Sequence, residues 1–297
     1  MTKGSGFKYN GSKDMNKQSK IKKALLPCGG LGTRFYPVAS VLPKEMLPLF
    51  GKPVLHYLVY DLIAQGVNEI CFVVSPQKSA IKEYFSNHAL TKQTIAYLKK
   101  QGDTHTALQL QEILDKAKFF YVEQETPKGS GDAVNLAKDF VSDDPCLLSW
   151  GDDIVFGDWV TDLTKAYDAT SGVTVGVMTI LGAEIEKYGV VAVQDAKQSK
   201  IALPDGLYQC FGMVEKPPKG KEPSRLASIG KYVITPQIFE ALRQCKPAKN
   251  GEYLFTDALQ KLCPQIYATV MSGRRYDLGD AQGLLQASLY LAGQQQG

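Results

Sequence analysis

Short runs of consecutive apolar residues recur along the first half of the chain, and segments with helical spacing of apolar residues separate them. Unbroken apolar runs are typical of strands that are covered on both faces of a sheet. Strands that alternate with helices at this spacing predict βαβ units and a mostly parallel sheet. The expected strands are residues 22–28, 68–75, 118–124 and 145–153, and the expected helices between them are 53–66, 77–87 and 131–140.

The pattern changes from about residue 172, where several strand-like runs follow one another with short turns. We expect this half to extend the sheet, to add a small β layer and to close with a C-terminal helix. Residues 88–117 are polar with helical spacing, and we expect them to form an insertion on the surface. The expected strands are 172–180, 188–194, 206–217 and 265–272, and the expected helices are 236–244, 255–262 and 280–292.

The whole pattern predicts an α/β fold: a Rossmann-like, mixed but mostly parallel sheet flanked by helices, with a small additional β layer in the C-terminal half. Residues 1–20 are rich in Gly, Ser, Asn and Lys, and we expect a disordered tail there. Residues 21–295 are enough for one domain with a substantial core. Ligands of open α/β sheets bind beyond the carboxyl ends of the strands, so the loops at 28–44, 124–132 and 151–154 should line one site.

Composition narrows the class of protein. Of the 297 residues, 44% are hydrophobic and 22% are charged, as in an ordinary globular enzyme. The net charge of +4 is too small to indicate nucleic acid or a membrane surface as a partner. No apolar run approaches the roughly 18 residues of a transmembrane helix, and the first residues lack the apolar segment of a secretory signal. The six cysteines form no C-x-x-C pair, which indicates buried free thiols rather than a zinc site, so we expect a cytoplasmic protein.

The loop after the first expected strand combines glycines with two cations. Gly29, Gly30 and Gly32 let backbone N–H groups approach an anion without a Cβ in the way. Arg34 offers a rigid fork of donors for phosphate oxygens, and Lys44 lies in a stiff stretch between two prolines. No G-K-[S/T] follows the glycines, and G-x-G-x-x-G is incomplete, so neither a P-loop nor a dinucleotide-binding dehydrogenase fits. The glycines alone also fit a plain tight turn, but together with the cations they favour a clamp for a triphosphate.

The motifs along the chain resemble those of the sugar-nucleotide pyrophosphorylases, which join a nucleoside triphosphate to a sugar 1-phosphate. The likeness extends from about Ile21 to about Leu291 and is greatest to the bacterial uridylyltransferases that act on UTP and glucose 1-phosphate. It implies a nucleotide-binding half at about 21–155 and a sugar-binding half at about 156–295 of a single nucleotidyltransferase domain. The motifs that carry the resemblance are G-x-G-T-R at 30–34, PKEMLPL, EKYGVV, MVEKP, IGKYVITPQIF, FTDAL and RYDLGD.

The resemblance implies a magnesium-dependent enzyme that makes UDP-glucose and pyrophosphate by direct attack of the sugar phosphate on the α-phosphorus of UTP. The glycine loop would wrap the triphosphate, and Arg34 and Lys44 would neutralise the leaving pyrophosphate. Gln124 and Gly129 would pair with the base, because an amide offers both a donor and an acceptor to an imide edge. The implied nucleotide-binding residues are Gly29, Gly30, Gly32, Thr33, Arg34, Lys44, Gln124 and Gly129.

Two aspartates match the magnesium ligands of the family. These are Asp152, at the end of an expected strand, and Asp277, in the RYDLGD motif. Asp153 and Asp280 are adjacent alternatives. Mg²⁺ is commonly bound by one or two carboxylates together with phosphate oxygens and water, so two aspartates suffice. An aspartate beside glycine otherwise fits an ordinary turn residue.

The resemblance also implies how the sugar phosphate is held. The backbone at Gly189 and the carboxylate of Glu215 would meet the hexose hydroxyls, and Lys216 would bind the sugar phosphate. A neighbouring Glu and Lys otherwise fit an ordinary exposed pair. The implied sugar-binding residues are Gly189, Glu215 and Lys216, and the implied catalytic residues are Arg34, Lys44, Asp152 and Lys216.

Several positions depart from the pattern of the uridylyl enzymes. Asp132 stands where those enzymes usually carry His and adenylyl-type members tend to have Asp, and Lys231 replaces a usual Arg. Tyr36 and Ser40 also differ. The base and the sugar therefore stay open: dTTP or ATP could replace UTP, and another hexose 1-phosphate could replace glucose 1-phosphate. The intact set of cations and carboxylates disfavours a non-catalytic sugar-nucleotide-binding relative. The resemblance further implies a homodimer or homotetramer.

Overall fold

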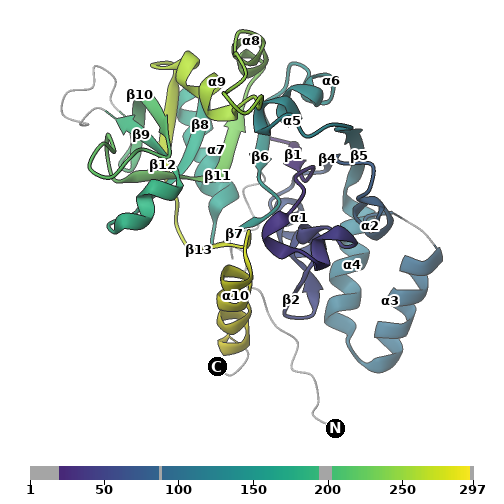
Figure 1. Cartoon of the computed structure of the whole chain (residues 1–297). Coiled ribbons are helices and arrows are strands. Elements are labelled where there is room, and N and C mark those ends of the chain that lie inside the picture. The colour runs from purple at the N-terminus through teal and green to yellow at the C-terminus, as the bar shows by residue number, and fades with distance from the viewer. Residues whose placement is uncertain (1–19, 87–88, 194–202, 295–297) are drawn as a thin grey trace.

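A nine-stranded mixed sheet forms the centre of the computed structural model, which describes residues 20–86, 89–193 and 203–294 (Figure 1). The expected disordered tail at 1–20 lies, apart from its last residue, outside the described residues. The strands of the sheet, in spatial order, are β5 (Lys118–Glu123), β4 (Glu69–Val74), β1 (Lys23–Pro27), β6 (Cys146–Ser149), β11 (Leu226–Ile234), β8 (Val173–Thr179), β12 (Ile266–Val270), β10 (Leu207–Glu215) and β9 (Gly189–Val193).

Helices flank this sheet, and two small sheets lie beside it. The two-stranded sheets pair β2 (Pro48–Leu49) with β3 (Lys52–Pro53), and β7 (Asp153–Phe156) with β13 (Arg274–Asp277). The α-helices are α1 (Val54–Ala64), α2 (Ser79–Tyr84), α3 (Ala89–Gln101), α4 (Thr104–Lys116), α5 (Ser130–Leu136), α6 (Lys138–Val141), α7 (Trp159–Thr170), α8 (Gln237–Arg243), α9 (Phe255–Leu262) and α10 (Ala281–Gly293). The short 3-10 helices are η1 (Thr33–Phe35), η2 (Val38–Ser40), η3 (Lys44–Met46) and η4 (Ala183–Lys187).

The direction of the strands confirms the expected α/β fold. Strand β1 pairs in parallel with β4 and β6, and β4 pairs in parallel with β5, so the carboxyl ends of these strands meet at one edge. Strands β11 and β10 run antiparallel to their neighbours, which makes the sheet mixed. The second half of the chain extends the sheet as expected, and the β7–β13 pair forms the small additional β layer.

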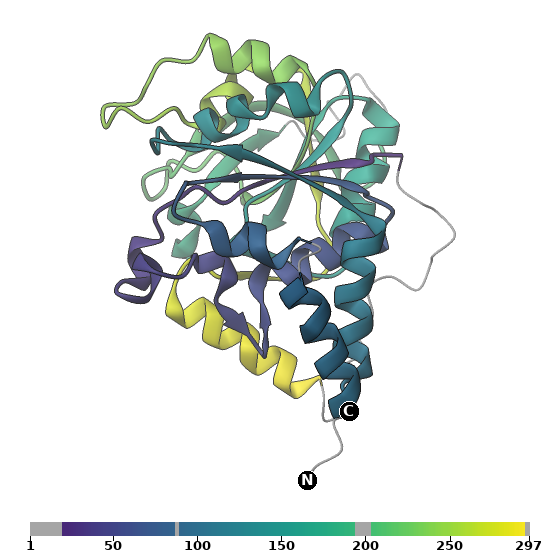
Figure 2. The ribbon, with the colours of Figure 1, turned by 90° about the vertical axis from the view of Figure 1, so that its right-hand side faces the viewer.

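Both faces of the sheet carry a hydrophobic core. In β1, Leu25 belongs to a cluster that includes residues of α5, α8 and α9, whereas Ala24 and Leu26 belong to a second cluster with α1 and α7. All three side chains are fully buried. Figure 2 shows helices on both sides of the sheet. Burial on both faces explains why the sequence shows unbroken apolar runs here instead of alternation.

A third hydrophobic cluster joins α10 to the β layer. It contains Ile154 of β7, Tyr276 of β13 and Leu291 of α10, together with Leu49 of β2. In Figure 1, α10 extends from the body of the molecule directly after β13. This packing holds the end of β13 in place, and that strand ends at Asp277.

The segment expected as a surface insertion forms α3 and α4, which lie side by side (Figure 1). The helical prediction for 88–117 is confirmed for the described part of this range. The two helices share a small cluster of Ile95, Ala107 and Leu110, and α4 also contacts α1, so one face is packed and not exposed. Within the described residues, no helix combines the length and apolar character needed to cross a membrane.

The central strand β11 was not among the expected strands. Its apolar pattern is interrupted by Gly230 and Lys231, and its pairing with β8 shifts register between Ser228 and Tyr232. Gly230 has φ 70°, and a Cβ there would lie 2.6 Å from Cδ1 of Trp150, so the irregularity requires glycine. Helix α7 and strand β13 were also not expected. The expected strand at 145–153 contains β6 and ends at the first residue of β7, and the expected helix at 131–140 divides into α5 and α6.

Lys231 is fully buried in the middle of β11. Its Nζ donates to Ser149 Oγ at 2.6 Å and to the carbonyl of Asp153, and it lies 5.1 Å from the centre of the Trp159 ring. Burial lowers the pKa of Lys231 from 10.5 to about 8, although the charge of Asp153 acts in the opposite direction. One ammonium group therefore links the end of β6 to the start of β7, and the turn between them contains Asp152.

Replacing Lys231 by methionine should change how stability depends on pH. The pKa of Lys231 is lower in the folded chain than its ordinary value of 10.5, so between about pH 8 and 10.5 the unfolded chain binds more protons. The free energy of unfolding of the wild type, relative to Lys231→Met, should therefore rise across this window by up to about 3 kcal/mol. Denaturant titrations at several pH values measure this difference. The exposed-site control Lys165→Met should show no such trend, and a pH-independent difference for Lys231→Met would contradict the lowered pKa.

Candidate active site

Residues 29–34, which we call the glycine loop, follow the carboxyl end of β1. Among the described residues, the backbone N–H groups of this loop donate no hydrogen bond to the protein. Gly32 has φ 67°, and a Cβ there would lie 3.4 Å from the Cβ of Lys44, so a side chain would be strained and would crowd the lysine. The loop presents free donors beside a cation, as the sequence predicts for a phosphate site.

A buried ion pair lies beneath this loop. Glu45 and Lys78 are 1% and 8% exposed, and Lys78 Nζ lies 2.8 Å from Glu45 Oε2. Lys78 also donates to the carbonyl of Cys28 at 2.5 Å. Burial raises the pKa of Glu45, and the charges of Lys78 and Lys44 only partly oppose this shift. The ammonium group of Lys78 therefore connects Cys28, the residue before the glycine loop, to Glu45 in the short helix η3.

Lys44, Asp152 and Arg34 come together from separate parts of the chain, as expected. Lys44 Nζ donates to Asp152 Oδ2, and Asp152 lies in the turn between β6 and β7. Burial acts to raise the pKa of Asp152, but the charge and hydrogen bond of Lys44, together with the charge of Arg34, hold it below its ordinary value. The carboxylate is thus kept ionised beside two cations.

Asp277 lies at the end of β13, next to the turn that carries Asp152. The backbone N–H of Leu278 donates to the carbonyl of Asp152 at 2.8 Å. The N–H of Gly279 donates to Asp277 Oδ1 at 2.9 Å. A Cβ on Gly279 would lie 2.7 Å from Arg34 Nη2, so the guanidinium of Arg34 lies against this turn as well. The two expected metal ligands therefore stand on adjoining stretches of backbone, with Arg34 close by.

The two alternative carboxylates have structural partners. Asp153 accepts two hydrogen bonds from Arg275, at 2.6 and 2.7 Å, and is 8% exposed. Burial acts to lower the pKa of Arg275, but Asp153 raises it well above its ordinary range. Asp280 caps α10 by accepting from the N–H of Gly283 at 2.9 Å. Both carboxylates are engaged in the fold, whereas Asp152 pairs with Lys44 beside the glycine loop, and Asp277 is more exposed and makes only a longer contact with Arg275, at 3.7 Å.

The expected base-reading residue, Gln124, lies against the glycine loop. It follows β5, is 4% exposed, and its Nε2 donates to Asp132 Oδ2 at 2.7 Å and to the carbonyl of Gly129 at 3.4 Å. A Cβ on Gly29 would lie 2.6 Å from Gln124 Oε1. Gly129 has φ 99°, and a Cβ there would lie 2.5 Å from the carbonyl oxygen of Tyr253. Glycine is therefore required at both positions for this arrangement.

The three expected sugar-binding residues also come together. Gly189 begins β9 and pairs with Glu215 at the end of β10. A Cβ on Gly189 would lie 2.8 Å from the methyl carbon of Met213 and 3.1 Å from Glu215 Oε2, so glycine keeps this carboxylate accessible. Burial raises the pKa of Glu215, with Lys216 acting against the shift. Lys216 has φ 46°, and its Nζ lies 3.8 Å from Glu215 Oε1.

Two residues that the sequence did not single out connect the sugar-binding residues to the β layer. Arg275 Nη1 donates to the hydroxyl of Tyr188 at 2.9 Å, and the carbonyl of Tyr188 accepts from the N–H of Lys216 at 3.0 Å. Arg275 precedes Asp277 by two residues in a strand, so both side chains leave the same face. That spacing in the RYDLGD motif was the available signal for Arg275.

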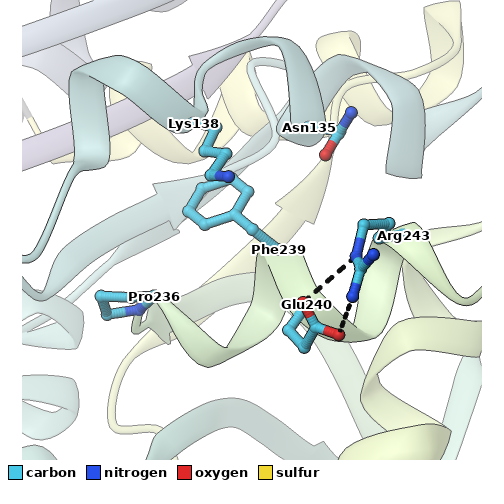
Figure 3. Close-up of a pocket in the computed structure, with 6 residues that line it drawn as sticks. All are labelled: Asn135, Lys138, Pro236, Phe239, Glu240 and Arg243. Atoms are coloured by element: carbon cyan, nitrogen blue, oxygen red, sulfur yellow. Dashed lines mark hydrogen bonds and ion pairs between the residues drawn. The ribbon is translucent and has the colours of Figure 1, made fainter.

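A surface cavity of about 360 Å³ lies elsewhere, between α5–α6 and α8 (Figure 3). Its Arg243 is already paired with Glu240 at 2.5 Å. None of the expected site residues lines this cavity, so it is not the candidate active site. Its lining residues are Asn135, Lys138, Pro236, Phe239, Glu240 and Arg243.

Residues 23–294 match the family model described as "Nucleotidyl transferase". The chain belongs to the nucleotidyl transferase family. A curated nucleotidyl transferase of Staphylococcus epidermidis, named UTP–glucose-1-phosphate uridylyltransferase, is 35% identical over 277 residues, which are 92% of this chain and 93% of that protein. A protein of the same name from Bacillus subtilis is 34% identical, over 92% of this chain and 91% of its own length.

Solved structures of nucleotidyl transferases show the same fold. A UDP-glucose pyrophosphorylase complexed with UDP-glucose is 32% identical, with a TM-score of 0.82 over 92% of this chain and 99% of that one. A UTP-bound UGPase from Acinetobacter baumannii is 27% identical, with a TM-score of 0.78 over 91% of this chain and 93% of that one. The likeness therefore covers more than nine-tenths of this chain.

Replacing Asp153 by asparagine should destabilise this nucleotidyl transferase fold. Arg275 would lose its close carboxylate partner and keep only the longer contact with Asp277, at 3.7 Å, and the loss of one partner of a buried pair costs about 3–5 kcal/mol. Denaturant unfolding, compared with the wild type, measures the loss. Asp205→Asn, at an exposed aspartate, is the matched control and should be neutral. An Asp153→Asn protein with wild-type stability would show that the pair does not hold the β layer in place.

Proposed function

We propose that the chain transfers a uridylyl group from UTP to glucose 1-phosphate, forming UDP-glucose and pyrophosphate. The observation that carries this proposal is the meeting of the glycine loop, Arg34 and the Lys44–Asp152 pair beyond the carboxyl ends of the parallel strands. The names of the relatives that match along nearly their whole length support the choice of UTP and glucose 1-phosphate. A sugar-phosphate oxygen bonds to the α-phosphorus, the bond to the bridging oxygen breaks, and its electron pair leaves with pyrophosphate.

The triphosphate would lie along the glycine loop. The free backbone N–H groups of residues 29–34 can donate to its oxygens, and the exposed guanidinium of Arg34 can grip two oxygens at once. Negative charge grows on the bridging oxygen as pyrophosphate leaves. Lys44 is held in place by η3 and by Asp152, so its positive charge is already positioned to stabilise that oxygen.

The sugar phosphate would approach from the β9–β10 side. Glu215 can accept hydrogen bonds from hexose hydroxyls, and the lack of a side chain at Gly189 leaves room for the ring. Lys216 carries its ammonium group on a largely exposed side chain next to this carboxylate, where it can bind the phosphate of the sugar. A cation between two anionic substrates lowers their repulsion and so favours the attacking geometry.

The donor set of Asp152 and Asp277 fits magnesium. Both are hard oxygen ligands on adjoining backbone, and Mg²⁺ takes one or two carboxylates together with phosphate oxygens. When bound, Mg²⁺ would neutralise phosphate charge and orient the triphosphate. Arg34 lies near both turns and would add its charge to the same phosphates.

Pyrophosphate release tests the proposal. The purified protein is incubated with glucose 1-phosphate, Mg²⁺ and, in parallel, UTP, dTTP, ATP, CTP or GTP. A preference for UTP supports the proposal, whereas a preference for dTTP or ATP keeps nucleotidyl transfer but changes the base. If all five fail, other hexose 1-phosphates are tried with the same triphosphates. No release with any combination overturns the proposal in favour of a protein that binds sugar nucleotides without turnover.

Asp277→Asn should keep the fold and lose most of the magnesium-dependent activity. An asparagine oxygen can still accept from the N–H of Gly279, and Arg275 keeps its closer partner Asp153 at 2.6 Å while it loses only the 3.7 Å contact with Asp277, so the melting temperature should stay near that of the wild type. The loss of a charged ligand should lower kcat by roughly 100-fold or more, and it should raise the Mg²⁺ concentration needed for half-maximal rate. Asp205→Asn is again the control at an exposed aspartate. Normal turnover by Asp277→Asn would remove this residue from the metal site.

A further inference from the structure

We propose that Asp132 sets the base preference of this chain by fixing the orientation of the Gln124 side-chain amide. The inference rests on the proposed nucleotidyl transfer and concerns which triphosphates are accepted. Asp132 lies in the first turn of α5, and Gln124 directly follows β5, so the contact joins two elements that border the glycine loop. Asp132 is thus a positioning residue, since it acts on the base through Gln124.

The contact holds a nearly buried amide. Gln124 is 4% exposed, and its own backbone N–H donates to the carbonyl of Val74 at 2.8 Å, which anchors the residue to β4. Its Nε2 donates to Asp132 Oδ2 at 2.7 Å and to the carbonyl of Gly129 at 3.4 Å. The two hydrogens of the amide nitrogen are therefore both directed to groups of the protein.

The chemistry of these neighbours allows one orientation of the amide. A carboxylate and a backbone carbonyl accept hydrogen bonds and donate none, so the NH₂ group of Gln124 must face Asp132 and Gly129. The carbonyl oxygen, Oε1, then points to the other side, toward Gly29 of the glycine loop. Among the described residues, Oε1 accepts no hydrogen bond, so it is available as an acceptor for a ligand.

A fixed acceptor selects bases that carry an N–H at the same place. Uracil and thymine have an N3–H between two carbonyl oxygens, whereas cytosine has a lone pair at N3. The N–H of Gly129 donates no hydrogen bond to the described residues and can donate to a carbonyl of the base. Oε1 of Gln124 and the N–H of Gly129 thus offer an acceptor and a donor, the complement of an imide edge. Cytosine in the same position would place two lone pairs opposite each other.

Replacing Asp132 by asparagine removes the stronger of the two restrictions and leaves only the longer contact with the carbonyl of Gly129, at 3.4 Å. An asparagine can accept from Gln124 as before, or it can donate to Oε1 after the glutamine amide has turned over. In the second arrangement the NH₂ group of Gln124 faces the base and suits the N3 lone pair of cytosine. The discrimination between UTP and CTP should then fall, while a merely structural defect would lower the activity with both triphosphates in the same proportion.

The experiment measures kcat/KM for UTP, dTTP and CTP with the wild type, Asp132→Asn and Asp132→Ala. The ratio of UTP to CTP should be high in the wild type and should fall roughly tenfold or more in both variants. The alanine variant removes the acceptor without adding a donor, and it serves as the second variant should the first fail to fold. Asp139→Asn, an exposed aspartate of α6, is the matched control and should keep the wild-type ratio.

Calorimetric binding of UDP and CDP gives the same comparison without turnover. An unchanged ratio of UDP to CDP affinity, together with an unchanged UTP to CTP ratio, in well-folded variants would overturn the role of Asp132 and leave the proposed reaction intact. Wild-type protein that binds UDP selectively but releases no pyrophosphate would overturn the proposed reaction, and the binding ratios of the variants would then decide the role of Asp132. Equal binding of UDP and CDP by the wild type would overturn the inference.

Discussion

The buried pair of Asp153 and Arg275, with the ammonium of Lys231 beside it, is the interaction on which the site depends. Asp153 begins β7, Arg275 belongs to β13 and Lys231 lies in β11, so the three charges join the β layer to the main sheet. Charges that are removed from water are stable only when they are paired and hydrogen-bonded, so few arrangements of these strands are acceptable. Asp152 and Asp277 flank this cluster along the backbone, and their positions follow from it.

The fold could be predicted best from the sequence for strands whose two faces are both buried. Strands β1, β4 and β6 show as apolar runs, and the helices that follow β1 and β4 show as helical spacing. The edge strand β5 is only partly buried, and it shows as a run of aromatic and β-branched residues. Strand β11 could not be predicted in this way, although it lies in the centre of the sheet. Gly230 and Lys231 read as a turn and a solvated charge, and only the distant partners Trp150, Ser149 and Asp153 make a positive φ and a buried ammonium acceptable there.

In the candidate site, residues that belong to a sequence motif could be predicted, whereas some of the residues that contact them could not. Residues within one motif, such as Arg34 in the glycine loop, could be identified from the sequence because their chemistry is local. Their partners Arg275 and Tyr188 could not, since these residues reach the site through strand pairing that no single segment specifies. The sequence also left Asp153 as an adjacent alternative to Asp152, because neighbouring carboxylates differ only in the face of the backbone from which they project.

In the ligand-free site, the charges of Lys44 and Asp152 compensate each other. Each group satisfies the other before any ligand arrives. An anion that binds Lys44 alone leaves the carboxylate of Asp152 without its partner, and a cation that binds Asp152 alone leaves the ammonium of Lys44 without its partner. A ligand that carries both a negative and a positive charge can replace both partners at once. For the proposed reaction, a triphosphate that arrives together with a divalent cation can replace both partners at once, whereas either ion alone can replace only one.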